Sequence, residues 1–169
     1  MNTSIKWMVA AGIAAIIGLT AYQQLAPTKG AMSQVSFTTI DHKKIDFADW
    51  QAQGKVTVVN FWATSCSTCK KEMPNMVKMY QELNPKGLEY VAIAMNYDNP
   101  EYIKNYVNEQ QLPFNVTWDQ EGRLATQFGG IMGTPTTFII DKRGNVIKQY
   151  VGEPNWDDMY SVINKAIAA

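Results

Sequence analysis

The feature that most constrains this chain is a pair of cysteines, Cys66 and Cys69, at the junction between an apolar run and a helix-like run. They are the only two cysteines of the 169-residue chain. Residues 56–62 are almost all apolar and β-branched, which is typical of a strand buried on both faces. A thiol at a helix start becomes more acidic, because unpaired backbone N–H groups and the helix dipole favour the thiolate. The junction therefore predicts thiol–disulfide exchange, with Cys66 and Cys69 as a redox-active disulfide.

Two cysteines at this spacing have other uses in proteins. Free cysteine is often buried, so an inert pair in the core remains an alternative. A structural zinc site needs four Cys or His ligands, and this chain has two cysteines and one histidine, His42. Haem attachment of the c type needs a histidine directly after the second cysteine, where Lys70 stands. We therefore expect no metal site and no cofactor other than the disulfide itself.

Length and charge further limit the functions that are possible for this chain. The chain is long enough for one compact domain after a leader, and its hydrophobic content of 46% allows a real core. Its formal net charge is +0, and it contains no dense basic run. Binding of nucleic acid therefore has no electrostatic support.

The first residues indicate a membrane or export segment. Residues 7–22 carry no charge, and Lys6 precedes them. As a helix this run would reach about 24 Å at ~1.5 Å per residue, close to the ~30 Å of a bilayer core. Trp7 and Tyr22 bracket the run as interfacial aromatic residues do. Residues 1–22 therefore predict an apolar helix that anchors the domain in the inner membrane, on the periplasmic side; the alternative is a cleaved signal peptide and a secreted protein.

After a polar linker at residues 23–34, strand-like and helix-like segments alternate. We expect strands at residues 35–40, 56–62, 88–95, 116–118, 136–140 and 145–150, and helices at residues 46–51, 66–83, 100–110, 123–128 and 156–168. Residues 41–44 read as a polar turn. Alternation that ends in a hairpin predicts an α/β fold in residues 35–169, with a mixed central sheet and helices on both faces.

The sequence resembles the thioredoxin fold and, more narrowly, the membrane-anchored TlpA/ResA-type thiol–disulfide oxidoreductases. The resemblance runs from residue 35 to the end of the chain. The motifs that carry it follow the family's order: Phe61-Trp62-Ala63, Cys66-Ser67-Thr68-Cys69, Glu72 and Pro74, and Gly133-Thr134-Pro135-Thr136-Thr137-Phe138. The chain departs from thioredoxin itself at Asn60, where thioredoxin has a buried aspartate, and at Ser65, where a tryptophan often precedes the first thiol.

The resemblance implies how the thiols divide the work. Cys66 is expected to be the attacking thiolate, and Cys69, one helical turn further on, the resolving thiol. Glu72 follows Cys69 by three residues and so lies on the same helix face. Its carboxyl either exchanges the proton of Cys69 or serves as an acid that favours the helix dipole.

The resemblance also implies a substrate-binding surface. Pro135 is similar to the cis-proline that faces the disulfide in this fold. It would expose the backbone of Thr134, which could pair with an extended substrate strand. Trp62 is expected to pack beneath the site, and we include it with Thr134 and Pro135 among the substrate-binding residues.

The function that the resemblance implies is an extracytoplasmic thiol–disulfide oxidoreductase that reduces disulfides of partner proteins. Its electrons would come from a membrane thiol relay, and its targets would belong to cytochrome c maturation or metal-site assembly. Two alternatives stay open: a protein-disulfide oxidant of the same fold, and a non-enzymatic Cu(I) chaperone or binding module. The sequence does not set the direction of electron flow, since ~30 mV already equals ~1.4 kcal/mol for this couple.

Overall fold

The computed structural model describes residues 30–169. The predicted membrane anchor or signal at residues 1–22 lies outside the described residues and stays a prediction. Between residues 30 and 169, no helix has the length and apolar character needed to cross a bilayer.

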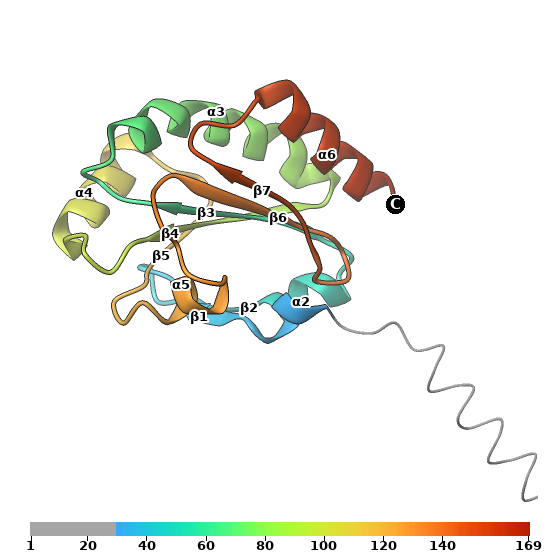
Figure 1. Cartoon of the computed structure of the whole chain (residues 1–169), viewed down its shortest axis with the longest axis horizontal. Coiled ribbons are helices and arrows are strands. Elements are labelled where there is room, and N and C mark those ends of the chain that lie inside the picture. The colour runs from blue at the N-terminus through green and yellow to red at the C-terminus, as the bar shows by residue number, and fades with distance from the viewer. Residues whose placement is uncertain (1–29) are drawn as a thin grey trace, which may run out of the picture.

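A five-stranded mixed sheet forms the centre of the fold (Figure 1). In the order β5-β4-β3-β6-β7, its strands are β5 (Asn115–Trp118), β4 (Leu88–Ala94), β3 (Val56–Trp62), β6 (Thr136–Ile140) and β7 (Val146–Val151). β3 runs parallel to β4 and antiparallel to β6. Both β3 and β6 are buried along their whole length, as their apolar sequences predict for strands at the centre of a covered sheet.

Helices cover both faces of this sheet (Figure 1). On one face lie α3 (Ser67–Leu83), α4 (Pro100–Gln110) and α6 (Trp156–Ala168), which share one core through Met76, Ile103 and Ile163. On the other face lie α2 (Phe47–Ala52) and α5 (Arg123–Gln127), where Phe47 and Leu124 pack in a second core. This arrangement confirms the predicted thioredoxin-like α/β fold with a mixed sheet between two helical layers.

The first part of the described chain departs from the prediction. The strand expected at residues 35–40 is shorter, β1 (Ser36–Thr38), and pairs antiparallel with β2 (Lys44–Asp46), which was not predicted. The sequence pattern predicts a polar turn at Lys44 and the start of a helix at Asp46. Because β2 is only three residues long and only partly buried, it has too few apolar positions to produce an alternating pattern.

The segment assigned to the linker also contains structure. The last residues of this segment form a 3-10 helix, η1 (Ala31–Gln34). The N–H of Gly30 donates to the carbonyl oxygen of Arg143 at 2.6 Å. A Cβ atom at position 30 would lie 2.2 Å from the carbonyl carbon of Gly144, so only glycine permits this approach. The folded region therefore includes residues 30–34.

The topology brings two segments that are distant in the sequence together at one end of the central strands. β3 ends at Trp62, and α3 begins after Cys66. β6 runs the opposite way, and Thr136 at its start pairs with Phe61 near the end of β3. The residues just before β6 therefore lie beside the turn between β3 and α3.

Candidate active site

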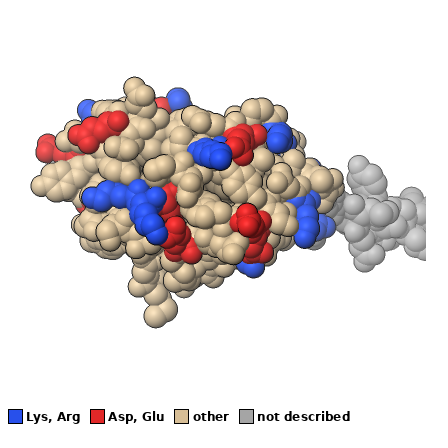
Figure 2. All heavy atoms as spheres, turned by 90° about the horizontal axis from the view of Figure 1, so that it is seen from above, with Lys and Arg blue, Asp and Glu red and all other residues tan. Residues whose placement is uncertain are grey.

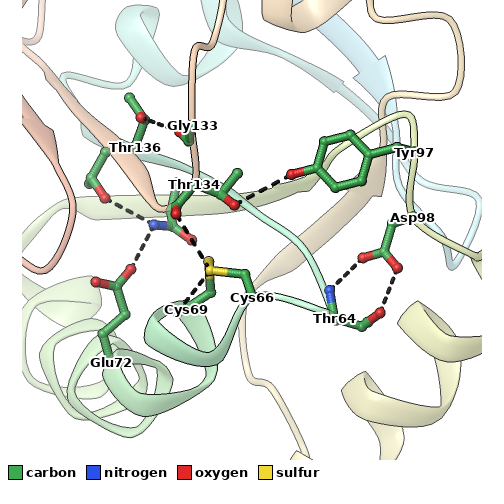
Figure 3. The surroundings of a disulfide bond; sticks show 11 residues. Thr64, Cys66, Cys69, Glu72, Tyr97, Asp98, Gly133, Thr134 and Thr136 are labelled. Atoms are coloured by element: carbon green, nitrogen blue, oxygen red, sulfur yellow. Dashed lines mark hydrogen bonds between the residues drawn. A yellow bond between two sulfur atoms is a disulfide. The ribbon is translucent and has the colours of Figure 1, made fainter.

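A disulfide joins Cys66 and Cys69 where β3 passes into α3 (Figure 3). Cys66 is the N-cap of α3, and its Sγ accepts a hydrogen bond from the N–H of Cys69 at 3.1 Å. Cys66 is partly exposed, whereas Cys69 is fully buried. Cys66 is therefore the residue that a partner protein can reach, and Cys69 lies behind it.

Two backbone groups act in opposite ways on charge at Cys66. The N–H of Cys69, at the start of α3, favours a thiolate at this position. The carbonyl oxygen of Thr134 lies 3.5 Å from the same Sγ, and its partial negative charge disfavours the thiolate. Lys70 and Lys71 follow Cys69 on α3, and Nζ of Lys71 pairs with Glu153 at 2.7 Å.

Glu72 is a fully buried carboxyl one turn after Cys69 (Figure 3). Its Oε1 accepts a hydrogen bond from Nδ2 of Asn60 at 3.1 Å, and its Oε2 has no partner among the described residues. Burial raises the pKa of Glu72 from 4.5 to about 7; the Asn60 hydrogen bond opposes this rise, and the charge of Glu153 adds to it. A carboxyl with this pKa takes up and releases protons near neutral pH.

Asn60 is a site residue whose part in holding Glu72 we did not predict. It lies in the middle of β3, directly opposite Thr137 of β6, and its Nδ2 donates to Oγ1 of Thr137 at 2.9 Å. All three side chains are fully buried. Nδ2 of Asn60 thus links Thr137 to Glu72 and orients the carboxyl. The signal was present, since an amide in an otherwise apolar strand needs a hydrogen-bond partner.

The loop before β6 faces the disulfide, as the resemblance predicted. The Thr134–Pro135 peptide bond is cis. The hydroxyl of Thr136 donates to the carbonyl oxygen of Gly133 at 2.7 Å, and the N–H of Gly152 donates to that of Pro135 at 2.8 Å. These contacts hold the loop so that the Thr134 carbonyl points at Cys66 (Figure 3).

Trp62 lies under the site rather than on its surface. The residue is fully buried, and its ring packs against Tyr106 with centroids 5.2 Å apart. This burial corrects the expectation that Trp62 takes part in substrate binding, because a fully buried ring offers a partner no surface. Thr134 and Pro135 remain the predicted substrate-binding residues beside Cys66.

The connection between β4 and α4 supplies two residues that we did not predict. Oδ2 of Asp98 accepts the N–H of Thr64 at 2.6 Å, and Oδ1 accepts its hydroxyl at 2.5 Å. The hydroxyl of Tyr97 lies 3.4 Å from Oγ1 of Thr134 (Figure 3). Neither residue belongs to a motif or a periodic pattern, and their position depends on tertiary folding alone.

The described residues around the disulfide include no metal cluster. No group of three or more His, Cys, Asp or Glu side chains within residues 30–169 is arranged to hold a metal ion. Two cavities of about 600 Å³ lie elsewhere, one between the β6–β7 turn and α6 and the other beside β5. Neither cavity is lined by the residues around the disulfide.

Comparison with known proteins agrees with this geometry. Residues 28–149 match the AhpC/TSA family. The thiol-disulfide oxidoreductase ResA of Bacillus thuringiensis (strain Al Hakam) is 32% identical over 155 residues, which cover 88% of this chain and 87% of ResA. ResA of Bacillus subtilis (strain 168) is 28% identical over 142 residues, which cover 80% and 77%.

A solved structure has a similar fold. The thiol:disulfide interchange protein of the thioredoxin family from Chlorobium tepidum TLS superposes with a TM-score of 0.72 at 32% identity, covering 83% of this chain and 97% of that chain. Together with the ResA relatives, this similarity confirms the predicted resemblance. The chain belongs to the AhpC/TSA family of thioredoxin-fold proteins and is a thiol–disulfide oxidoreductase of the ResA type, with Cys66 and Cys69 as its cysteine pair.

Proposed function

We propose that this oxidoreductase reduces disulfides of partner proteins outside the cytoplasm, with Cys66 as the attacking thiolate and Cys69 as the resolving thiol. One observation carries the proposal. The exposed sulfur is backed by a buried one, and a buried carboxyl with a pKa of about 7, that of Glu72, lies one helical turn beyond.

The reaction begins with the reduced pair. The thiolate of Cys66 attacks one sulfur of the partner's disulfide, forms a mixed disulfide and releases the other sulfur as a thiolate. Cys69 then gives its proton to Glu72, and the resulting thiolate attacks Sγ of Cys66. The mixed disulfide breaks, the second partner sulfur leaves as a thiolate, and the Cys66–Cys69 disulfide forms. Two electrons have passed to the partner, whose thiolates take up protons from solvent, and Glu72 returns its proton to solvent.

The direction of electron flow depends on how well the site stabilises the reduced pair. DsbA is a strong oxidant because its reduced form is stabilised. In this site the Thr134 carbonyl oxygen and the Glu72 carboxyl both oppose negative charge on the sulfurs. Among the described residues, the N–H of Cys69 is the hydrogen-bond donor that favours such charge. A site that opposes negative charge on the sulfurs stabilises the reduced pair little, which supports a reductase.

The proposal extends to location and partners. The uncharged run at residues 7–22 supports an inner-membrane anchor with the domain in the periplasm, a compartment that permits disulfides. A membrane thiol relay would return the two electrons to the Cys66–Cys69 disulfide. The resemblance to ResA-type proteins supports partners whose cysteines must be reduced before a cofactor is attached, as in cytochrome c maturation or metal-site assembly.

The reduction potential of the Cys66/Cys69 pair tests the proposal. The chain is equilibrated with glutathione buffers, and free thiols are alkylated and counted by mass. We expect a potential below that of the glutathione pool, which lies at about −220 to −260 mV by extraction. A potential near the ~−120 mV of DsbA would make the chain an oxidant and overturn the proposed direction. A Cys66→Ala variant, which cannot form the internal disulfide, shows the mass shift of Cys69 alone.

A further inference from the structure

We propose that Tyr97 is a specificity-determining residue of this site. Its ring forms one wall of the surface around Cys66 and selects partner segments that carry an apolar side chain next to the reacting cysteine. The inference rests on the proposed function, because it names the class of partner that the same site takes.

Tyr97 stands at the border of the approach to Cys66. It is 63% exposed although it carries a large aromatic ring. Its hydroxyl is 3.4 Å from Oγ1 of Thr134, and the carbonyl oxygen of Thr134 is 3.5 Å from Sγ of Cys66. Figure 3 shows the ring reaching from the β4–α4 connection toward Thr134. A polypeptide that joins its sulfur to Cys66 therefore passes close to this ring.

Asp98 anchors the β4–α4 connection that carries Tyr97. Asp98 is almost fully buried and accepts three hydrogen bonds: two from Thr64, and one from the N–H of Asn99 at 2.9 Å. Thr64 belongs to the turn that leads into Cys66. Adjacent residues of the β4–α4 connection thus contact both loops of the site. Tyr97 contacts the loop that contains Thr134, and Asp98 contacts the turn that leads into Cys66. A backbone anchored in this way loses little conformational freedom when a partner binds.

A second exposed apolar side chain lies on the other loop. Met132 is fully exposed and precedes Thr134 by two residues. Methionine adapts its shape to different apolar partners. On the face shown in Figure 2, basic and acidic side chains lie side by side. Tyr97 and Met132 are thus two exposed apolar side chains, one on the β4–α4 connection and one on the loop before β6.

The geometry of disulfide exchange defines what Tyr97 contacts. The partner's sulfur must come within bonding distance of Cys66, and an extended segment can then pair with the exposed backbone of Thr134. Because Tyr97 contacts Thr134, a side chain next to the partner's cysteine then comes within reach of the Tyr97 ring. Burying that side chain against the ring strengthens binding if it is apolar.

Two synthetic disulfide-bonded peptides test the inference. They are identical except for the residue next to each cysteine, which is leucine in one and serine in the other. The reduced full-length chain, in detergent, should reduce the leucine peptide with the higher kcat/KM. In Tyr97→Ala the ratio of the two kcat/KM values should fall about tenfold, or ~1.4 kcal/mol. Tyr97→Phe keeps the ring and should keep most of the preference.

Tyr102 provides the matched control. It is also exposed, at 62%, but lies on α4, and Tyr102→Ala should retain the wild-type ratio. Because each ratio compares two peptides on one variant, partial unfolding cancels. An equal ratio in wild type and Tyr97→Ala overturns the inference. Failure of the wild type to reduce either peptide contradicts the proposed function instead.

Discussion

Replacing Glu72 with glutamine should remove a pH-dependent loss of stability. Burial raises the pKa of Glu72 from 4.5 to about 7. Between these pH values the folded protein holds a proton that the unfolded chain has released. The free energy of unfolding therefore decreases as the pH rises from about 4.5 to about 7, and the full decrease is present above pH 7.

The size of this effect follows from the shift in pKa. A change from 4.5 to about 7 corresponds to about 3 kcal/mol, since one pKa unit is worth ~1.36 kcal/mol. Glutamine cannot ionise, and its carbonyl oxygen can still accept the hydrogen bond from Asn60. Its NH₂ group replaces Oε2, which has no partner among the described residues. Any free-energy cost of burying this NH₂ group does not depend on pH. The difference between the two pH profiles therefore isolates the ionisation of Glu72.

Urea unfolding of the oxidised full-length chain at pH 4.5, 6, 7 and 8 measures both profiles in one detergent. Relative to Glu72→Gln, the wild type should lose about 3 kcal/mol between the lowest and highest pH. The control is Glu101→Gln, which removes an exposed carboxyl from the first turn of α4 and should follow the wild type. Parallel profiles for wild type and Glu72→Gln would show that Glu72 ionises normally, and would remove it from the mechanism.

The same variant should slow the step in which Cys69 resolves the mixed disulfide. A positioned proton acceptor is typically worth 10²- to 10⁴-fold. We expect at least a tenfold slower release of partner at pH 7. The defect should shrink at higher pH, because hydroxide can then accept the proton of Cys69 in place of Glu72. Stopped-flow release of a labelled partner measures this, and a defect independent of pH would contradict the role of Glu72.

Two further substitutions test the packing around the site. Asp98→Asn places an amide NH₂ opposite a donor from Thr64. The substitution should therefore lower the free energy of unfolding, measured in urea, by about 2 kcal/mol. A change below about 0.5 kcal/mol would show that these hydrogen bonds do not fix the loop. Met159→Ala empties a fully buried position of α6 and should cost about 2–5 kcal/mol by the same measurement, and an unchanged midpoint would contradict the described core.

The central architecture could be predicted because its elements have long, recognisable apolar patterns. β3 and β4 are seven-residue strands of mostly apolar residues, and α3 begins directly after Cys66. Such runs specify the type of element wherever they occur. The alternation of strands and helices then limits the topology to a mixed sheet with covered faces. Only the bounds changed, by one or two residues.

The short elements could not be predicted in the same way. β2 has three residues, and its place is set by pairing with β1, in which Ser36 lies opposite Asp46. η1 packs near the β6–β7 turn because Gly30 fits closely against Gly144. Both depend on segments far apart in the sequence, whereas local patterns report only near neighbours.

The site residues that belong to sequence motifs could be predicted. Those that are brought to the site by tertiary contacts could not. Cys66, Cys69 and Pro135 stand in recognisable motifs, and the structure places them together. The link from Thr137 through Asn60 spans 77 residues, and the contact of Tyr97 with Thr134 spans 37. Such pairs are decided by strand register and loop course, which the sequence pattern does not encode residue by residue.

The division of roles between the two thiols is the central claim, and trapping of the mixed disulfide tests it most directly. Cys69→Ser and Cys66→Ser variants are incubated with one disulfide-bonded peptide, quenched with acid and analysed by mass spectrometry. Cys69→Ser should accumulate a stable adduct through Cys66, because the resolving thiol is missing. Cys66→Ser should form little adduct, since Cys69 is fully buried. Comparable adduct formation through Cys69 would contradict the account.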